Sequence, residues 1–367
     1  MGQKLKLLSE LPRIDAASYA DKLIAARAAI GELKGACYGL PNPQLLLSPT
    51  IMREALESSE IENVVTTLED VLQAQLFSEQ EQSPADKEVL RYNKALEAGI
   101  ESMKNSYLGE NTIKDVHAVL IPTEPDIRRT QNALRNAVTG EVVYMPPSAE
   151  SLPKYLSDLE KFINSSDERL DPVLKTIITH YQFEAIHPFG DGNGRTGRIL
   201  MVLCMLNYEL LDLPVLFISE YINNNKAEYY SVFKKADDTG ELDGFINYML
   251  DAFTMQAQKS TTVLLGIRKL HEDTKRYIRE QLPNIYSRDL IDAIFSQPLM
   301  TATRYEEIMR CSYPTASSHL KLLEEKGILQ SVKIGKYLIF ANIKLMEFLR
   351  SNPAFGSNSN MGKQIQI

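Results

Sequence analysis

The chain has 367 residues, of which 44% are hydrophobic and 24% are charged, and its formal net charge is −8. These values are ordinary for a soluble globular protein and argue against one built mainly to coat nucleic acid, while leaving room for one small DNA-binding module. Three widely spaced cysteines, Cys37, Cys204 and Cys311, fit neither a disulfide framework nor a zinc site. Because no signal stretch or membrane-spanning apolar run is found, we expect a cytoplasmic protein without a membrane partner.

Most of the sequence has helical spacing of its apolar residues, so we expect a mainly α fold. The dipeptide Ser48-Pro49 is a typical helix start, and apolar residues from 61 to 72 then recur at helical intervals. Asp171-Pro172 repeats the start signal before a second apolar stretch. That helix should end near Ile186, because His187 precedes a proline and is pushed out of the α region.

One segment departs from this spacing. Residues 135 to 144 predict two short strands around Thr139-Gly140, followed by two prolines, and we interpret them as a β-hairpin.

The C-terminal third predicts a separate module. Helices are expected at 288–297, 303–310 and 314–325, and strands at 328–332 and 337–340. Three helices followed by a hairpin is the order of a winged helix. The tail from Ser351 is rich in Ser, Asn and Gly, and we expect it to be disordered.

Residues 187 to 198 read His-Pro-Phe-Gly-Asp-Gly-Asn-Gly-Arg-Thr-Gly-Arg and gather groups that suit a polyphosphate. Alternating glycines let the backbone approach a ligand, and the N-terminus of the helix that follows supplies N–H groups and a positive dipole end. Arg195 and Arg198 are three apart and can reach one polyphosphate. Asp191 could hold Mg²⁺ through one carboxylate, and His187 could accept a proton near neutral pH.

Three familiar motifs do not account for this segment. Gly192, Gly194 and Gly197 match the dinucleotide-binding spacing, but a helix rather than a buried strand precedes them. Arg198 stands where a P-loop requires lysine, and Thr196 stands where an EF-hand requires glycine. A turn that merely caps a helix is disfavoured, because a base, a metal carboxylate, an anion loop and two arginines occupy twelve residues.

With every fixed position present, the segment resembles the signature of Fic-domain proteins, His-Pro-Phe-x-Asp/Glu-Gly-Asn-Gly-Arg-x-x-Arg. The resemblance implies transfer of AMP from ATP, with Mg²⁺, to a Ser, Thr or Tyr hydroxyl of a target protein. It implies that His187 deprotonates the hydroxyl, that Asp191 holds the metal and that Arg198 grips the γ-phosphate. Phe189 is expected to anchor the loop in the core. Further nucleotide contacts are implied for Gly192, Asn193, Gly194, Arg195, Thr196 and Gly197.

The resemblance covers about residues 48 to 255. The hairpin is similar to the family's flap, which would hold a target segment by strand addition. Asp237 stands near the position where the family often carries an Asn that faces the base. For a pair of tyrosines at the expected adenine position, ordinary core packing is an equally good interpretation. The flap and tyrosine residues implied to lie near the nucleotide are Val142, Val143, Tyr144, Tyr229 and Tyr230.

Ser58, Glu62 and Asn63 fit the pattern Ser/Thr-x-x-x-Glu-Gly/Asn, which resembles the inhibitory motif of Fic proteins that regulate themselves. Ser58 and Glu62 are four apart on one helix face, and the carboxylate could pair with Arg198. An arginine so engaged cannot hold the γ-phosphate. A solvated helix face is the alternative interpretation. If Glu62 instead positions a water for removing AMP, the protein would be bifunctional, and the residues leave this open.

Residues 313 to 327 resemble the recognition helix of winged-helix DNA-binding domains, in which Thr315, Ser317, Ser318 and His319 would face bases or phosphates. Between 286 and 350 nine basic residues stand against seven acidic ones, and a net charge of +2 is thin for tight DNA binding. Protein contacts or a homodimer are equally open. The alternative functions are therefore a DNA-binding regulator whose Fic domain senses or modifies a partner, and a Fic enzyme that uses another donor or removes AMP.

We thus expect a helical Fic core with a β-hairpin flap, plus a C-terminal winged-helix domain. The expected parts are an N-terminal helical region with the inhibitory helix (1–107), the Fic core (108–255), a helical connector (256–285), the winged helix (286–350) and the tail (351–367).

Overall fold

The computed structural model describes residues 5–11, 14–38, 43–135, 142–166 and 170–351. The turn expected at Thr139-Gly140 and the tail after residue 351 lie outside the described residues. Within those described ranges, no helix has both the length and the apolar character that a membrane crossing requires.

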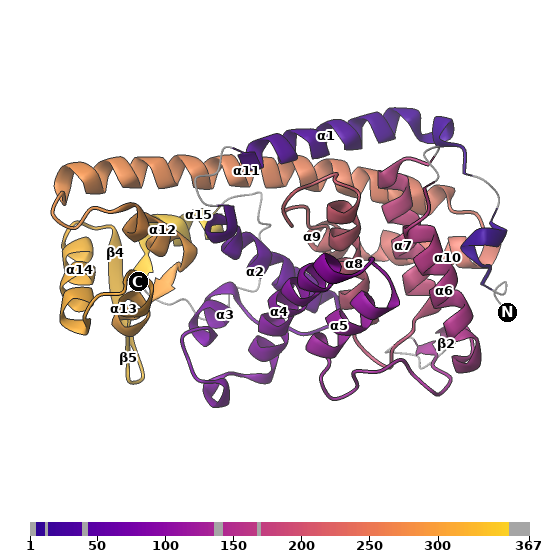
Figure 1. The fold of residues 1–367 in the computed structure, drawn as a ribbon, viewed down its shortest axis with the longest axis horizontal. Coiled ribbons are helices and arrows are strands. Elements are labelled where there is room, and N and C mark those ends of the chain that lie inside the picture. The colour runs from indigo at the N-terminus through magenta and orange to yellow at the C-terminus, as the bar shows by residue number, and fades with distance from the viewer. Residues whose placement is uncertain (1–4, 12–13, 39–42, 136–141, 167–169, 352–367) are drawn as a thin grey trace. The chain divides into compact units, whose positions relative to one another are not determined.

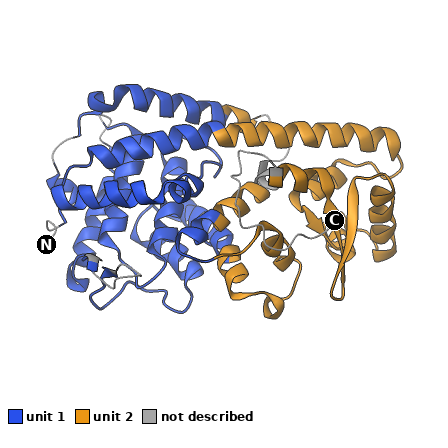
Figure 2. Cartoon of the chain, turned by 180° about the vertical axis from the view of Figure 1, so that it is seen from behind, with its two compact units in different colours: residues 1–34, 57–64, 91–258 blue, residues 35–56, 65–90, 259–367 orange. Residues whose placement is uncertain are grey.

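The described chain is mainly helical and forms two compact units (Figures 1 and 2). One unit comprises residues 1–34, 57–64 and 91–258, and the other comprises 35–56, 65–90 and 259–367. Neither unit is continuous in sequence. The expected division into five consecutive parts stays a prediction.

Four helices contribute residues to both units, and the rest belong to one. The shared helices are α1 (Ala20–Tyr38), α2 (Pro43–Ile61), α4 (Pro84–Asn105) and α11 (Asp243–Gln281). The first unit also holds α5 (Glu110–Leu120), β1 (Leu134–Arg135), β2 (Val142–Tyr144), α6 (Leu152–Ile163), α7 (Pro172–Ile186), α8 (Asn193–Asn207), α9 (Ser219–Asn224) and α10 (Lys226–Thr239).

Helices α7 and α8 are the centre of the first unit. Thirteen of the 15 residues of α7 and twelve of the 15 residues of α8 are buried, so both helices are packed on almost every face. α6 packs on α7, and α5 packs on α8. The start of α7 is confirmed: Asp171 Oδ1 accepts a hydrogen bond from the N–H of Val173 at 2.8 Å. The loop between α7 and α8 therefore connects two almost fully buried helices.

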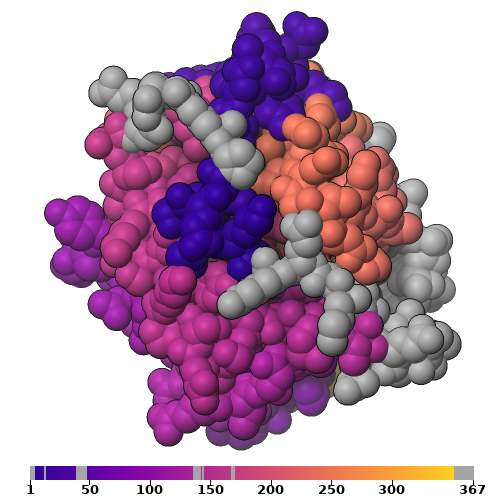
Figure 3. All heavy atoms as spheres, turned by 90° about the vertical axis from the view of Figure 1, so that its right-hand side faces the viewer, coloured from indigo at the N-terminus to yellow at the C-terminus, as the bar shows by residue number. Residues whose placement is uncertain are grey.

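The N-terminal segment lies on one face of this unit. Figure 3 shows it in dark indigo, with the magenta elements of the middle of the chain to its left and below it and salmon-coloured later elements to its right. Its backbone is hydrogen-bonded to α6, through Tyr155 Oη to Leu5 O at 2.7 Å, and to α7, through Gln182 Nε2 to Lys6 O at 2.9 Å. Residues 5 to 8 thus belong to the packed body of the unit.

The expected helix start at Ser48-Pro49 was wrong. α2 begins at Pro43 and passes through Pro49, because its next turns are packed in the interior, where Met52 and Ala55 are fully buried. The helical spacing expected through 61 to 72 is interrupted after Ile61. A new helix, α3 (Leu68–Ala74), starts where the Thr67 hydroxyl accepts from the N–H of Asp70.

The second unit contains the winged helix in the expected order. Its elements are α12 (Arg288–Ser296), α13 (Ala302–Met309), α14 (Tyr313–Glu325), β4 (Leu329–Ile334) and β5 (Tyr337–Asn342). Two elements were not predicted, β3 (Leu299–Met300) and α15 (Ile343–Ser351). The sheet order is β3-β5-β4, antiparallel throughout, with Met300 opposite Phe340 and Val332 opposite Ile339.

Candidate active site

The loop between α7 and α8 begins with a residue in the left-handed conformation. His187 has φ 49°, and its N–H still donates to Phe183 O at 3.0 Å. The proline that follows disfavours the α region for His187, so the helix ends here. Phe189 is fully buried and stacks on His117 with ring centroids 3.6 Å apart. The expected anchoring of the loop in the core is confirmed.

Asn193 holds the loop closed. Its Oδ1 accepts from the N–H of Phe189, and its Nδ2 donates to Phe189 O, both at 2.9 Å. The side chain is therefore used within the protein, and any phosphate contact of this residue must come from its backbone. The intrahelical ladder of α8 starts with Thr196 N to Gly192 O at 3.0 Å. The N–H groups of residues 193 to 195 precede this bond and point to the helix N-terminus, where anions bind.

Two predicted nucleotide residues face the interior. The Thr196 hydroxyl donates to Gly192 O at 2.8 Å and lies 3.4 Å from His117 Nδ1. A side chain at Gly197 would overlap the carboxylate of Glu184. These positions let α8 approach α5 and α7 closely, which positions the first turn of α8.

His187 lies in an environment that keeps its imidazole neutral. Burial lowers its pKa to about 4, and the positive charge of Arg128 acts in the same direction. Arg128 is itself buried and donates to three carbonyl groups, of His187 at 2.9 Å, Thr130 at 3.0 Å and Pro147 at 2.5 Å. A neutral imidazole can accept a proton at pH 7. Nothing in the sequence pattern pointed to Arg128, because its partners are backbone carbonyls, two of them distant in the chain.

Asp191 lies at the open side of the loop. Its side chain is 73% exposed, with Oδ1 accepting from the N–H of Gly192 at 2.6 Å and Oδ2 3.7 Å from the Arg195 guanidinium. Within the described ranges, no three His, Cys, Asp or Glu side chains gather as a metal site. One exposed carboxylate suits a Mg²⁺ that takes its other ligands from phosphates and water.

Arg198 lies in the interior and is bound to the end of α2. Its Nε donates to Ser58 Oγ at 2.7 Å, and its Nη2 donates to Ser58 O at 2.8 Å and to Glu62 Oε1 at 3.0 Å. The Arg198 side chain is 4% exposed and that of Glu62 is 35% exposed. The expected contact between Glu62 and Arg198 is therefore present, with Ser58 as a further acceptor. Arg198 is charged in this setting: burial lowers its pKa, but the negative charge of Glu62, and that of Glu184 when it is ionised, outweigh burial and raise the pKa.

The geometry at the end of α2 explains why the inhibitory motif has Gly or Asn after its glutamate, at position 63. α2 ends at Ile61, and Asn63 has φ 65°. The N–H groups of Glu62 and Val64 both donate to Ser59 O at 3.0 Å, a typical helix ending around a left-handed residue. Glycine and asparagine tolerate this conformation best. Glu62 lies one residue beyond the helix, and not on its face as expected.

The flap and tyrosine residues fall into different environments. Tyr144 Oη donates to Ala185 O at 2.6 Å, and Val142 is 44% exposed. β1 and β2 pair with Leu134 opposite Tyr144, while the Val143 side chain lies outside the described residues. Buried Tyr229 has its Oη 3.0 Å from His180 Nε2, so core packing accounts for it. The five positions therefore do not share one environment. Tyr230, like Val142, is exposed, with 48% of its surface accessible.

Glu184 is an acid beneath the site that the sequence interpretation missed. Its side chain is 13% exposed, and one of its oxygens has no hydrogen-bond partner among the described residues. Burial raises its pKa to about 8 despite the nearby charge of Arg198. The sequence feature that could have indicated this buried acid is that Glu184 is the one acidic residue within α7.

The winged helix presents few of its predicted DNA contacts. Thr315 and Ser318 are exposed, but Ser317 and His319 are half-buried, and His319 Nδ1 lies 3.0 Å from the hydroxyl of buried Tyr305. Two of the four predicted contact residues are therefore accessible to a partner.

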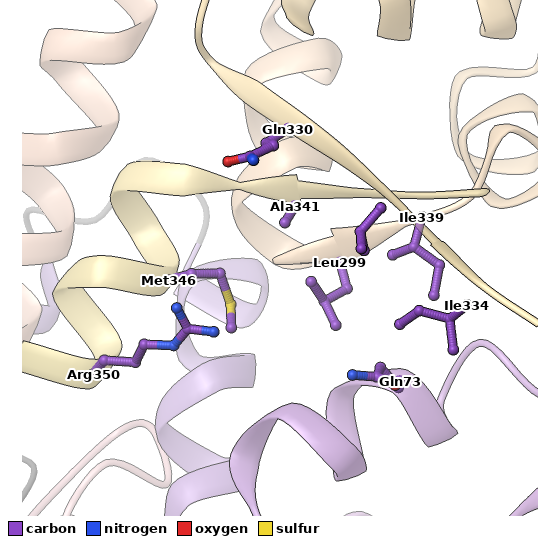
Figure 4. A pocket seen from close by; sticks show the side chains of 9 residues that line it. Gln73, Leu299, Gln330, Ile334, Ile339, Ala341, Met346 and Arg350 are labelled. Carbon is purple, nitrogen blue, oxygen red and sulfur yellow. The ribbon is translucent and has the colours of Figure 1, made fainter. Parts of the chain in front are cut away.

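Side chains at the tip of the β4–β5 hairpin contact the chain around α3, within the same unit. Tyr337 stacks on Phe77 with centroids 4.9 Å apart, and Lys336 Nζ lies 3.0 Å from Glu81 Oε1. Arg350 Nε donates to Glu69 at 2.6 Å. Figure 4 shows the small pocket between these parts, with Leu299, Ile334, Ile339 and Met346 on the winged-helix side and Gln73 opposite.

Three family profiles match successive parts of the chain. The profile described as Fic/DOC family N-terminal matches residues 20–101, and the profile of the Fic/DOC family matches 107–205. The profile of the protein adenylyltransferase SoFic-like C-terminal domain matches 270–345. The matches include the inhibitory motif, the loop with the first turn of α8 and most of the winged helix.

Among curated relatives, protein adenylyltransferase fic-1 of Caenorhabditis elegans is 34% identical over 109 residues, which are 29% of this chain and 20% of that protein. Protein adenylyltransferase Fic of Drosophila melanogaster is 31% identical over 111 residues, or 29% and 21% of the two chains. The matched part thus spans about a fifth of the length of these relatives.

Solved structures share the fold. The crystal structure of a Fic family protein from Desulfovibrio desulfuricans has a TM-score of 0.59 at 22% identity, covering 90% of this chain and 98% of that one. A Fic domain containing signaling protein from Bacteroides thetaiotaomicron has a TM-score of 0.52 at 20% identity, covering 66% and 97%.

Proposed function

This chain belongs to the Fic/DOC family, and on that premise we propose that it is a protein adenylyltransferase that transfers AMP from ATP to a hydroxyl of a target protein. The observation that carries the proposal is the loop of residues 187–192. It places a neutral imidazole, an exposed carboxylate and a helix N-terminus within one short segment. Together they supply a base, a metal ligand and an anion-binding site for attack on a phosphorus atom.

The proposed reaction is a displacement at the α-phosphorus of ATP. The target oxygen forms the new O–P bond while the bond to pyrophosphate breaks, and the hydroxyl proton passes to the His187 imidazole. The first-turn N–H groups of α8 and the Arg195 guanidinium stabilise the phosphate charge. Asp191 would hold the Mg²⁺, which neutralises charge on the leaving pyrophosphate when bound.

We further propose that residues 57–64, called the inhibitory turn below, restrain this reaction. A γ-phosphate that is to bind Arg198 must first displace the Glu62 carboxylate from Nη2, where it lies at 3.0 Å. With Glu62 in place, the negative phosphate would also be repelled by the negative Glu62 carboxylate. ATP then binds in a pose that does not align the α-phosphorus with His187.

The C-terminal module supports protein contacts better than DNA binding. Winged helices that bind DNA also contact it with the hairpin beside the recognition helix. Here two residues of that hairpin, Lys336 and Tyr337, contact Glu81 and Phe77. We therefore propose that this module binds protein, including the chain's own residues 69–81.

The test of the enzymatic proposal compares ATP labelled at the α-phosphate with ATP labelled at the γ-phosphate. Wild type, Glu62→Gly and His187→Ala are each incubated with Mg²⁺ and cell lysate, and label bound to protein is counted. We expect label only from the α position, more with Glu62→Gly and none with His187→Ala. Label from the γ position, or label that survives His187→Ala, would contradict the proposed reaction.

A further inference from the structure

We propose that Lys226 is a positioning residue that stabilises the inhibitory turn, and that it connects this turn to helix α10. The proposal rests on the self-inhibited function proposed above. The observation is a hydrogen bond from Lys226 Nζ to the carbonyl oxygen of Ile61 at 2.6 Å. Lys226 is the first residue of α10, far from the inhibitory turn in sequence and outside the sequence motif of the inhibitory residues.

The bonded carbonyl belongs to the last residue of α2. The last carbonyl groups of a helix have no intrahelical donor and carry its negative dipole end, and a lysine ammonium satisfies both requirements. Ile61 immediately precedes Glu62. The direction of the Ile61 carbonyl therefore fixes the direction in which the chain leaves α2 and carries the Glu62 side chain toward Arg198.

A second contact comes from the same corner of the fold. Asn223 Nδ2, in α9, donates to Glu57 Oε2 at 3.2 Å, one helical turn before Ile61. The inhibitory turn is thus bound from two elements. α8 binds Ser58 and Glu62 through Arg198, and the junction of α9 and α10 binds Glu57 and Ile61. Four residues of the inhibitory turn thus each have a hydrogen-bond partner outside it, and the position of the turn depends on both α8 and the α9–α10 junction.

Helix α10 also carries Tyr230, four residues after Lys226 and hence on the same face one turn along. Tyr230 is the exposed tyrosine of the predicted nucleotide contacts, and the charges of Glu62 and Arg198 both act on its phenol. A nucleotide that binds Tyr230 therefore binds the same turn of α10 that holds Ile61.

The experiment measures AMP transfer by Lys226→Met in two backgrounds, the otherwise wild-type chain and Glu62→Gly. Loss of a hydrogen bond from a charged donor weakens the inhibitory turn, so we expect AMP transfer to rise about tenfold or more in the wild-type background. We expect no change in the Glu62→Gly background, where nothing remains to be positioned. Lys226→Arg, which keeps the charge, should stay close to wild type.

Lys234→Met is the matched control, because Lys234 lies on the same helix and pairs with Asp238 at the surface, 3.0 Å away. It should leave activity unchanged in both backgrounds. Equal activity of Lys226→Met and wild type would overturn the proposal. So would a loss of activity in both backgrounds, since that result assigns Lys226 to the fold or to nucleotide binding.

Amide hydrogen exchange separates this proposal from the enzymatic one. In the full chain without ATP, the amides of residues 59–64 should exchange faster in Lys226→Met than in wild type or Lys234→Met. If Glu62→Gly shows no AMP transfer, the proposed reaction fails, while faster exchange still supports the stabilising role of Lys226. Unchanged exchange would reject that role whatever the activity shows.

Discussion

The carboxylate of Glu62 lies against Gly194, in the space that a Cβ at position 194 would fill. The same carboxylate accepts the hydrogen bond from Arg198 at 3.0 Å. Gly194 is in the first turn of α8, where phosphates are expected to bind. The absence of a side chain at Gly194 therefore lets the acid that follows α2 approach the positive end of α8, where a phosphate is expected to bind.

Replacing Glu62 should release the enzyme in proportion to the charge removed. A hydrogen bond between charged groups contributes ~1.5–3 kcal/mol, so Glu62→Gly should raise AMP transfer by about 10- to 100-fold. Glu62→Gln keeps the shape and an acceptor oxygen but lacks the charge. Its rate of AMP transfer should therefore lie between those of wild type and Glu62→Gly. Initial rates at saturating ATP and Mg²⁺ measure the series. Equal rates for all three proteins would contradict a restraint by Glu62.

Position 63 should tolerate glycine but not a β-branched residue. Asn63 has φ 65°, a conformation that costs ordinary L-residues ~1–2 kcal/mol. Asn63→Gly should therefore keep the low activity of wild type. Asn63→Val should weaken the inhibitory turn and raise activity by about 5- to 30-fold. Combining Asn63→Val with Glu62→Gly serves as the control, because a further increase there would mean that Asn63 acts by another route.

The pH dependence should reflect a depressed histidine pKa. Burial and the charge of Arg128 lower the pKa of His187 to about 4, so the base stays neutral as pH falls through the ordinary value of 6.5. For Glu62→Gly, the limb of kcat/KM assigned to this base should fall only as pH approaches 4. Removing a positive neighbour with Arg128→Gln should move that limb to higher pH. A limb near 6.5 in both proteins would contradict the assigned environment.

The twelve residues from 187 to 198 could be recognised from sequence because a single loop and the helix turn after it carry almost all of the proposed chemistry. Local signals also predicted the limits of α7, since Asp171 caps its start and a proline follows His187. Glu62 could be paired with Arg198 only through the family resemblance. Their side chains meet by tertiary packing across 136 residues of sequence.

Contacts to backbone carbonyls could not be predicted. Arg128 and Lys226 bind carbonyl oxygens of distant residues, and a carbonyl carries no sequence signal. The continuation of α2 through Pro49 was missed for a related reason, since burial of the following turns overrides local propensity. The two-residue strand β3 is too short to show alternation and exists only through its pairing with β5.

The C-terminal module should not bind duplex DNA within the full chain. The hairpin residues Lys336 and Tyr337 are engaged by Glu81 and Phe77, and residues 286–350 carry a net charge of only +2. We expect no gel shift of duplex DNA by the full chain at either low or physiological salt. A shift that weakens as salt rises would favour the DNA-binding alternative instead.

Glu184 should make the free energy of unfolding decrease as pH rises. The lowered pKa of His187 acts on stability in the opposite direction. Burial raises its folded pKa from 4.5 to about 8, so the folded chain retains a proton that the unfolded chain loses above 4.5. The contribution of this acid to stability is fully present below pH 4.5 and is lost as pH rises toward 8. Glu184→Gln keeps the neutral shape without this penalty. Its midpoint of thermal unfolding, compared with wild type, should therefore rise between pH 5 and pH 8, while a difference that is constant with pH would show that Glu184 is ionised in the fold.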